Sequence, residues 1–301
     1  MFAKLTELAR WSAPSVLTLG ALVAGLTAVR CAAEGIFTAS VKCVMLAAVL
    51  DGLDGHTARY LGTSTELGFE LDSLCDLANF GVTPALVMYF WSKDLPMESD
   101  AFGQHGTIWA FCCIYCACCA LRLARFNVAG RATEMDMELP EAKPPPTCLS
   151  VAASIWKNVS SRRLYFQGVP APVGAAYALV PMMLQLSSLP RVLGAVGEAG
   201  AWSIGRRGSA ATLLVTAVLM VSPLPTFSSK MLKTYRKDTH LSSRGYGSML
   251  LKLAAVSIFG YVFWRWPFEV FLAMVMSHVL SIPIGVLAFA TFVRDGADKD
   301  N

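Results

Sequence analysis

About eight strongly apolar segments alternate with short charged ones along the chain, and this alternation limits the folds that it can adopt. A helix of about 20 apolar residues spans the hydrocarbon core of a bilayer. The apolar segments cover approximately residues 14–33, 36–58, 72–92, 106–126, 169–189, 209–224, 249–265 and 268–292. Charged residues make up 15% of the 301 residues, whereas soluble domains carry about 25%. We therefore predict an all-α, polytopic membrane protein with about eight transmembrane helices.

Four aspartates interrupt this apolar pattern within the stretch DGLDGHTARYLGTSTELGFELDSLCD, residues 51–76. Asp51 and Asp54 are three residues apart, and Asp72 and Asp76 are four apart, so each pair lies on one face of a helix. Carboxylates beside a bilayer core are costly unless they are paired or bind cations. We therefore expect a helical hairpin whose two acidic faces converge on a site.

Local signals between the two acidic pairs support this hairpin. Gly62 can end the first helix, and Thr63 with Glu66 fits a capping box at the start of the second. Arg59 offers a planar group that matches phosphate oxygens. Small residues that let a ligand approach closely are Gly55, Ala58 and Gly68. Clustered carboxylate oxygens favour Mg²⁺ or Mn²⁺ over zinc.

The same stretch fits the pattern D-x2-D-G-x2-A-R-x8-G-x3-D-x3-D at every position, and in this the chain resembles the CDP-alcohol phosphotransferase family. The segment PSVLT, residues 14–18, is similar to the family's opening P-N-x-x-T segment, with Ser15 in place of asparagine. DSLCDLANFGVTPALVMY and ALRLARFNV are similar to the phosphatidylserine synthase branch of that family. The resemblance covers about residues 14–236 and implies a six-helix core, followed by two additional transmembrane helices over 237–293.

This resemblance implies transfer of a phosphatidyl group from CDP-diacylglycerol to the hydroxyl of L-serine, with release of CMP. It also implies that two divalent cations, Mg²⁺ or Mn²⁺, are held by Asp51, Asp54, Asp72 and Asp76. Asp76 is expected to serve as the general base as well, because a carboxylate beside a cation stays ionised and can accept a proton. The residues implied in binding CDP-diacylglycerol are Ser15, Thr18, Gly55, Ala58, Arg59, Thr65 and Gly68.

Two arginines end the fourth apolar segment. Arg122 and Arg125 are three residues apart, with Asn127 just beyond them. Guanidinium groups bind carboxylates and phosphates, so these three residues are candidates for binding the serine carboxylate or the lipid phosphate. The alternative is that the arginines only anchor the helix end at the cytoplasmic surface.

Basic residues outside the apolar segments place the acidic hairpin on the cytoplasmic side of the membrane. Residues 1–13 are predicted to form an interfacial helix, residues 14–236 the membrane domain with a cytoplasmic loop at about 130–168, and residues 294–301 a charged tail. The expected membrane is the endoplasmic reticulum or a bacterial-type inner membrane. A homodimer is expected from the resemblance, and the net charge of +4 without a basic patch gives no indication of nucleic-acid binding.

Five of the nine cysteines lie in the stretch FCCIYCACCA, residues 111–120. This stretch is apolar and has no histidine nearby, so we interpret its cysteines as small packing residues. Palmitoylation or redox chemistry is the alternative.

Two other functions stay open from the sequence. The first is the same chemistry with another alcohol, such as inositol or glycerol phosphate, or with an ether-lipid counterpart of CDP-diacylglycerol. The second is a non-catalytic membrane protein that binds or transports cations through its intramembrane aspartates. Release of CMP separates the second function from the enzymatic ones.

Overall fold

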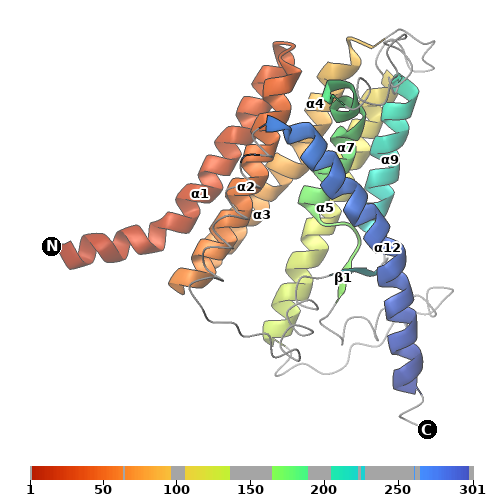
Figure 1. Cartoon of the computed structure of the whole chain (residues 1–301). Helices are drawn as coiled ribbons and strands as arrows, with labels where there is room; N and C mark the ends of the chain where they lie inside the picture. Colours follow the sequence, from red (N-terminus) through yellow and green to blue (C-terminus); the bar gives the residue numbers. More distant parts are fainter. Residues whose placement is uncertain are drawn as a thin grey trace. The chain divides into compact units, whose positions relative to one another are not determined.

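A computed structural model describes residues 2–63, 65–95, 106–135, 165–188, 205–222, 225–227, 261 and 265–297, and nearly all of these are helical (Figure 1). The helices are α1 (Phe2–Ala33), α2 (Phe37–Leu61), α3 (Glu66–Asp76), the π-helix η1 (Leu77–Val82), α4 (Thr83–Ser92), α5 (Gly106–Met135), α7 (Ala171–Leu186), α9 (Arg206–Val221) and α12 (Pro267–Ala297). Within the described ranges, two three-residue strands, β1 (Tyr165–Gln167) and β2 (Pro225–Phe227), form one antiparallel pair. The all-α prediction is confirmed.

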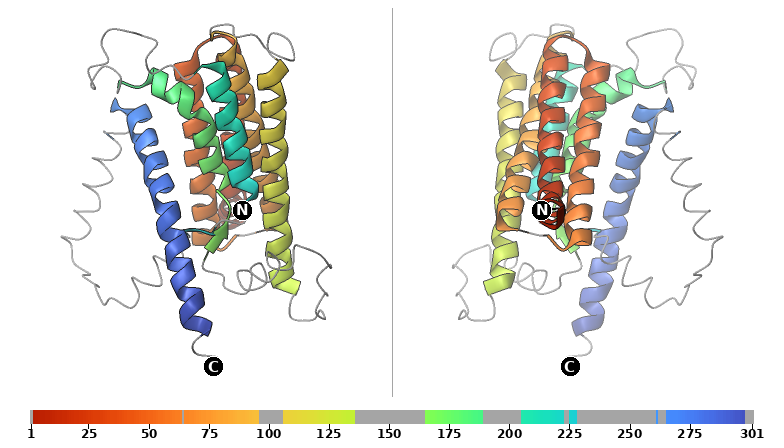
Figure 2. Two further views of the ribbon diagram at one scale, coloured as in Figure 1. Left: turned by 90° about the vertical axis from the view of Figure 1, so that its right-hand side faces the viewer. Right: turned by 90° about the vertical axis from the view of Figure 1, so that its left-hand side faces the viewer.

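The contacts divide the chain into two compact units. The first consists of Met1–Phe126 and Ala171–Val221, and the second of Asn127–Pro170 and Ser222–Asn301. Figures 1 and 2 show that the helices of the first unit lie side by side and run along roughly one direction, as in a membrane bundle. In the second unit, β1 pairs with β2, and α12 packs against β2. All the described residues of the acidic hairpin belong to the first unit.

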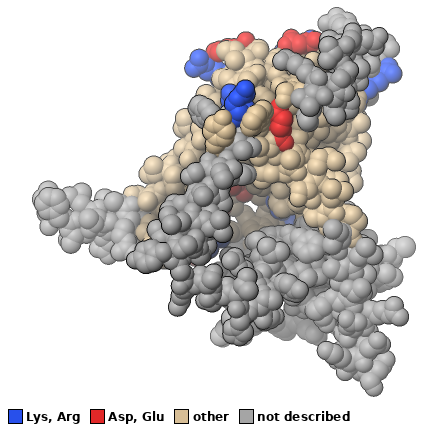
Figure 3. Space-filling model, viewed as in Figure 1, with Lys and Arg blue, Asp and Glu red and all other residues tan. Residues whose placement is uncertain are grey.

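Among the residues that the structure describes, three helical segments are long and apolar enough to cross a membrane, namely Ser12–Ala33, Glu66–Ser92 and Gly106–Val128, and two shorter helices are also apolar, Ala171–Leu186 and Pro267–Pro283. On α1, Val16, Val23 and Leu26 are each more than 60% exposed, as expected for side chains that face lipid. On the face seen in Figure 3, most of the surface of the described residues carries neither Lys and Arg nor Asp and Glu. The chain is a polytopic membrane protein, and the count of about eight spans stays a prediction.

Several predicted boundaries differ from those of the helices. The interfacial helix and the first span are one continuous helix, α1, which bends in its N-terminal part (Figure 1) and contains Pro14, a residue that cannot donate a helical hydrogen bond. Helix α5 continues to Met135, so the loop predicted from residue 130 begins later in the chain. Residues 136–164, 228–260 and 298–301 lie outside the described residues. The predicted domain limits therefore remain predictions.

The core of the first unit fixes helix α4, which continues the chain beyond the acidic hairpin. Val87 and Met88 of α4 are fully buried. Arg206, only 4% exposed, donates hydrogen bonds from Nε and Nη2 to the carbonyl oxygen of Ser92 at 3.3 and 3.1 Å, and from Nη2 to that of Leu95 at 3.1 Å. These bonds satisfy carbonyls at the C-terminal end of α4 that have no helical partner. The position of α4 in the bundle is thereby set.

Candidate active site

The turn between α2 and α3 brings the two acidic pairs together. Gly62 follows α2 with φ +65° and ψ 31°, the left-handed conformation that ends a helix, so that prediction is confirmed. The capping prediction was wrong by two residues, because Thr65 precedes α3 and its Oγ1 accepts a hydrogen bond from the Gly68 N–H at 3.0 Å. Thr63 is instead buried, and its Oγ1 has no partner among the described residues.

Three carboxylates converge across this turn. Asp51 of α2 and Asp72 and Asp76 of α3 each offer one oxygen, and these oxygens all lie within 4.8 Å of one another. Oδ1 of Asp76 is buried and lacks a hydrogen-bond partner in the described part of the chain. Carboxylates this close repel one another unless a cation compensates their charge. A set of carboxylate oxygens with a buried unpaired member therefore fits a hard divalent cation such as Mg²⁺ or Mn²⁺.

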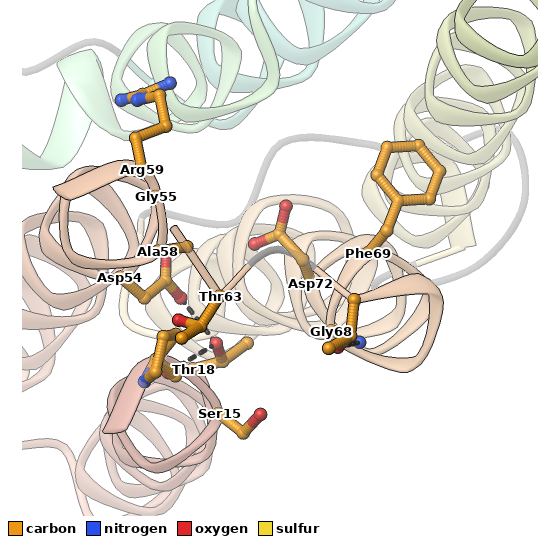
Figure 4. A pocket seen from close by; sticks show the side chains of 12 residues that line it. Ser15, Thr18, Asp54, Gly55, Ala58, Arg59, Thr63, Gly68, Phe69 and Asp72 are labelled. Carbon is orange, nitrogen blue, oxygen red and sulfur yellow. Dashed lines mark hydrogen bonds between the residues drawn. The ribbon is translucent and has the colours of Figure 1, made fainter. Parts of the chain in front are cut away.

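The fourth aspartate, Asp54, lies outside this group of three and is held separately. It is 4% exposed, and its Oδ2 lies 2.6 Å from the hydroxyl of Thr18 in α1. The same hydroxyl is 3.0 Å from the carbonyl oxygen of Pro14. A hydroxyl has one proton, and the shorter contact to a carboxylate is the stronger bond. Thr18 and Asp54 therefore connect α1 and α2 at the edge of the site (Figure 4).

A pocket of about 230 Å³ lies between α1, α2 and α3, next to the acidic cluster (Figure 4). All seven residues that the family resemblance implies for CDP-diacylglycerol line it: Ser15, Thr18, Gly55, Ala58, Arg59, Thr65 and Gly68. Asp54 and Asp72 line it as well. Sequence reasoning missed Pro14, Thr63 and Phe69 as lining residues. Pro14 and Phe69 are direct neighbours of Ser15 and Gly68, which is the signal that could have suggested them.

Arg59 reaches along α2 rather than toward the carboxylates. Its Nη2 lies 3.4 Å from Nδ1 of His56, and this Nδ1 is 2.9 Å from the carbonyl oxygen of Gly52. A carbonyl only accepts, so a hydrogen bond there requires the proton on Nδ1, which then cannot accept from Arg59. The exposed guanidinium of Arg59 can thus turn to a ligand in the pocket.

The three residues predicted to bind serine or a lipid phosphate all lie on α5, and the structure describes different surroundings for them. Arg122 is half-buried, its charge attracts that of Asp76, and its buried Nε has no partner among the described residues. Arg125 donates from Nη1 to the carbonyl oxygen of Val221 at 3.1 Å and so caps the C-terminal end of α9. Asn127 belongs to the second unit. Of the three, Arg122 is the one that lies beside the acidic cluster.

Comparison with known proteins decides the family. The family model described as CDP-alcohol phosphatidyltransferase matches residues 11–188, a span that includes the pocket and the acidic cluster. The chain belongs to the CDP-alcohol phosphatidyltransferase family. As a member of this family, the chain is a membrane-bound transferase of phospholipid biosynthesis that transfers phosphatidyl groups.

Several curated relatives of this CDP-alcohol phosphatidyltransferase carry the same name. The CDP-diacylglycerol–serine O-phosphatidyltransferase of Mycobacterium tuberculosis strain H37Rv is 30% identical over 275 residues, which are 91% of this chain and 77% of the relative. That of Mycobacterium leprae is 28% identical over 273 residues, 91% of this chain and 74% of the relative. The protein of that name from Helicobacter pylori strain J99 is 32% identical over 121 residues, 40% of this chain and 48% of the relative. The two mycobacterial matches extend well beyond the family model.

Proposed function

We propose that this transferase moves the phosphatidyl group of CDP-diacylglycerol to the hydroxyl of L-serine, giving phosphatidylserine and CMP. The observation that carries the proposal is one hairpin that places a cluster of three carboxylates beside a pocket lined by all seven residues implied in CDP-diacylglycerol binding. Serine as the acceptor is supported by the names of the relatives.

The pocket residues suit the nucleotide and diphosphate part of the donor. Gly55 and Gly68 leave room for close approach, and the planar guanidinium of Arg59 matches phosphate oxygens. The buried hydroxyl of Thr63 and that of Ser15 are polar partners for the nucleotide. The acyl chains stay in the lipid while CMP and serine exchange with the cytosol, so a site at the membrane surface accommodates both kinds of substrate.

The acidic cluster suits a divalent cation. Asp51, Asp72 and Asp76 would hold the metal, with Asp54, positioned by Thr18, as the fourth carboxylate. When bound, Mg²⁺ or Mn²⁺ would neutralise the diphosphate and stabilise charge on the transferring phosphoryl group, and two such ions are expected in this family.

Asp76 and Arg122 together orient the acceptor. The guanidinium of Arg122 binds the serine carboxylate, and the serine hydroxyl then lies toward Asp76. Asp76 accepts the hydroxyl proton as the serine oxygen forms its bond to phosphorus. The bond from phosphorus to the CMP oxygen breaks, and CMP leaves. The site faces the cytoplasm of the endoplasmic reticulum or of a bacterial-type inner membrane in this proposal, and the protein acts as a homodimer.

The test is CMP release from membranes that carry this chain, supplied with CDP-diacylglycerol and Mn²⁺ or Mg²⁺. Release is measured without an acceptor and with L-serine, inositol or glycerol 3-phosphate. We expect release that depends on serine and on the metal. Release only with another alcohol would refute serine as the acceptor, and no release with any acceptor would refute the enzymatic proposal in favour of cation binding alone.

A further inference from the structure

A π-helical turn, η1, follows directly after Asp76 and joins α3 to α4. Such turns are rare and occur mostly as single turns within α-helices, often at functional sites. The turn lowers the stability of the fold at Asn79. This side chain is 99% buried, and neither its Oδ1 nor its Nδ2 has a hydrogen-bond partner among the described residues. On this side the turn packs closely on α1, where Gly25 has no room for a Cβ atom against Asn79.

Helix α5 holds the turn from another side. The hydroxyl of Tyr115, a fully buried residue, donates a hydrogen bond of 2.6 Å to the carbonyl oxygen of Phe80 inside the turn. One residue further, a Cβ atom on Gly81 would lie 3.2 Å from Sγ of Cys119. Pro84, four residues after Phe80, has no N–H, so the Phe80 carbonyl would lack a backbone donor in a regular α-helix, and the Tyr115 hydroxyl supplies one. This bond anchors the turn to α5.

The turn sets how α3 is rotated relative to α4. Each residue advances an α-helix by about 100°. The side chains of Val87 and Met88 fix α4 in the core. If η1 changed to a regular α-helix while α4 stayed in place, α3 would rotate about its axis by about 100°, the angle of one residue. This rotation would turn Asp72 and Asp76 away from Asp51. The convergence of the three carboxylates thus depends on the π-helical turn.

We propose that Tyr115 is a positioning residue for the transfer reaction, because its hydrogen bond to the Phe80 carbonyl maintains the π-helical turn that keeps Asp76 facing Asp51. Tyr115 acts through the backbone and touches neither substrate. The expected effect of Tyr115 on turnover rests on the proposed function, but it does not require serine to be the acceptor.

Tyr115→Phe removes only the hydroxyl and tests this role. Mn²⁺ is titrated into the purified full chain in detergent without substrate, and free Mn²⁺ is measured by electron paramagnetic resonance. We expect the dissociation constant for Mn²⁺ to rise about tenfold, the lower end of the effect of residues that orient metal ligands. The Mn²⁺ concentration that gives half-maximal CMP release should rise in parallel.

Tyr89→Phe is the matched control, since it makes the same change on α4 and keeps the ring, whose centroid is 5.2 Å from that of Trp109. We expect it to bind Mn²⁺ like the parent. Gly81→Ala is a second variant, which crowds the turn by placing a Cβ atom 3.0 Å from Leu77 Cδ1 and 3.2 Å from Cys119 Sγ, and it should weaken Mn²⁺ binding in the same direction. If Tyr115→Phe does not elute as a single species in size-exclusion chromatography, the Mn²⁺ affinity of Gly81→Ala tests the inference instead.

Parent-like Mn²⁺ affinity in a well-folded Tyr115→Phe variant would overturn the inference and leave the proposed function standing. An equal loss in Tyr89→Phe would overturn it too, since it would mean that any lost hydroxyl loosens the bundle. If the parent releases no CMP with any acceptor, the proposed function fails, whereas the Mn²⁺ titration still tests the role of Tyr115.

Discussion

Replacing Thr18 with valine isolates the bond between α1 and the buried aspartate of α2. The substitution keeps the volume of the side chain and removes the hydroxyl that lies 2.6 Å from Asp54 Oδ2. Thr18 and Asp54 are 5% and 4% exposed, so water does not replace the lost donor. A hydrogen bond to a charged group contributes about 1.5–3 kcal/mol. Because every 1.4 kcal/mol is about a factor of ten, we expect kcat/KM for CDP-diacylglycerol to fall by about 10- to 150-fold.

The assay is CMP release from purified protein at fixed serine and varied CDP-diacylglycerol, with Thr18→Ser as the matched control. Serine retains the hydroxyl, so this control should keep most of the parent's kcat/KM. A thermal-unfolding midpoint for each variant separates a loss at the site from a loss of fold. If Thr18→Val is as active as Thr18→Ser, the bond to Asp54 does not position the site, and the reasoning is refuted.

Three further substitutions test other parts of the account. Asp76→Asn should abolish CMP release while the protein stays folded and inserted in the membrane, because the amide can neither accept the proton nor serve as an anionic ligand; turnover at the parent's rate would contradict that role. Arg122→Ala should raise KM for serine more than KM for CDP-diacylglycerol, and equal effects on both would favour a lipid or structural role. Arg206→Ala should lower the free energy of unfolding by about 2–4 kcal/mol, since it removes the hydrogen bonds that the carbonyls of Ser92 and Leu95 accept from the guanidinium, and a change under about 0.5 kcal/mol in a denaturation assay would exclude this capping role.

The acidic hairpin could be predicted because its signals are local. The spacing of the aspartates fixes a helix face, and Gly62 ends α2 in the conformation that glycine favours. The predicted cap of α3 was wrong, because both Thr63 and Thr65 can cap a helix, and in the structure Thr65 caps α3 while Thr63 is buried. A choice between two neighbouring threonines depends on packing, which the local pattern does not contain.

The π-helical turn and the partners of the arginines could not be predicted, because they depend on contacts between distant parts of the chain. Nothing in the apolar run from Leu77 to Val82 distinguishes a π-helix from an α-helix, and the hydroxyl that bonds to it comes from Tyr115, 35 residues away. The sequence made Arg125 a candidate for binding serine or a lipid phosphate together with Arg122, yet Arg125 caps α9, whose last residue is 96 positions further along. Position along a helix predicted the face of each arginine but not its partner.

The most direct test of the central claim follows the serine atoms into the lipid. Purified protein is incubated with CDP-diacylglycerol, Mn²⁺ and L-serine labelled with ¹³C and ¹⁵N, and the lipid product is identified by mass spectrometry while CMP is quantified. We expect labelled phosphatidylserine and CMP in equal amounts, with neither formed by the Asp76→Asn variant. CMP release without labelled lipid, or labelled lipid from the variant at the parent's rate, would contradict the central claim.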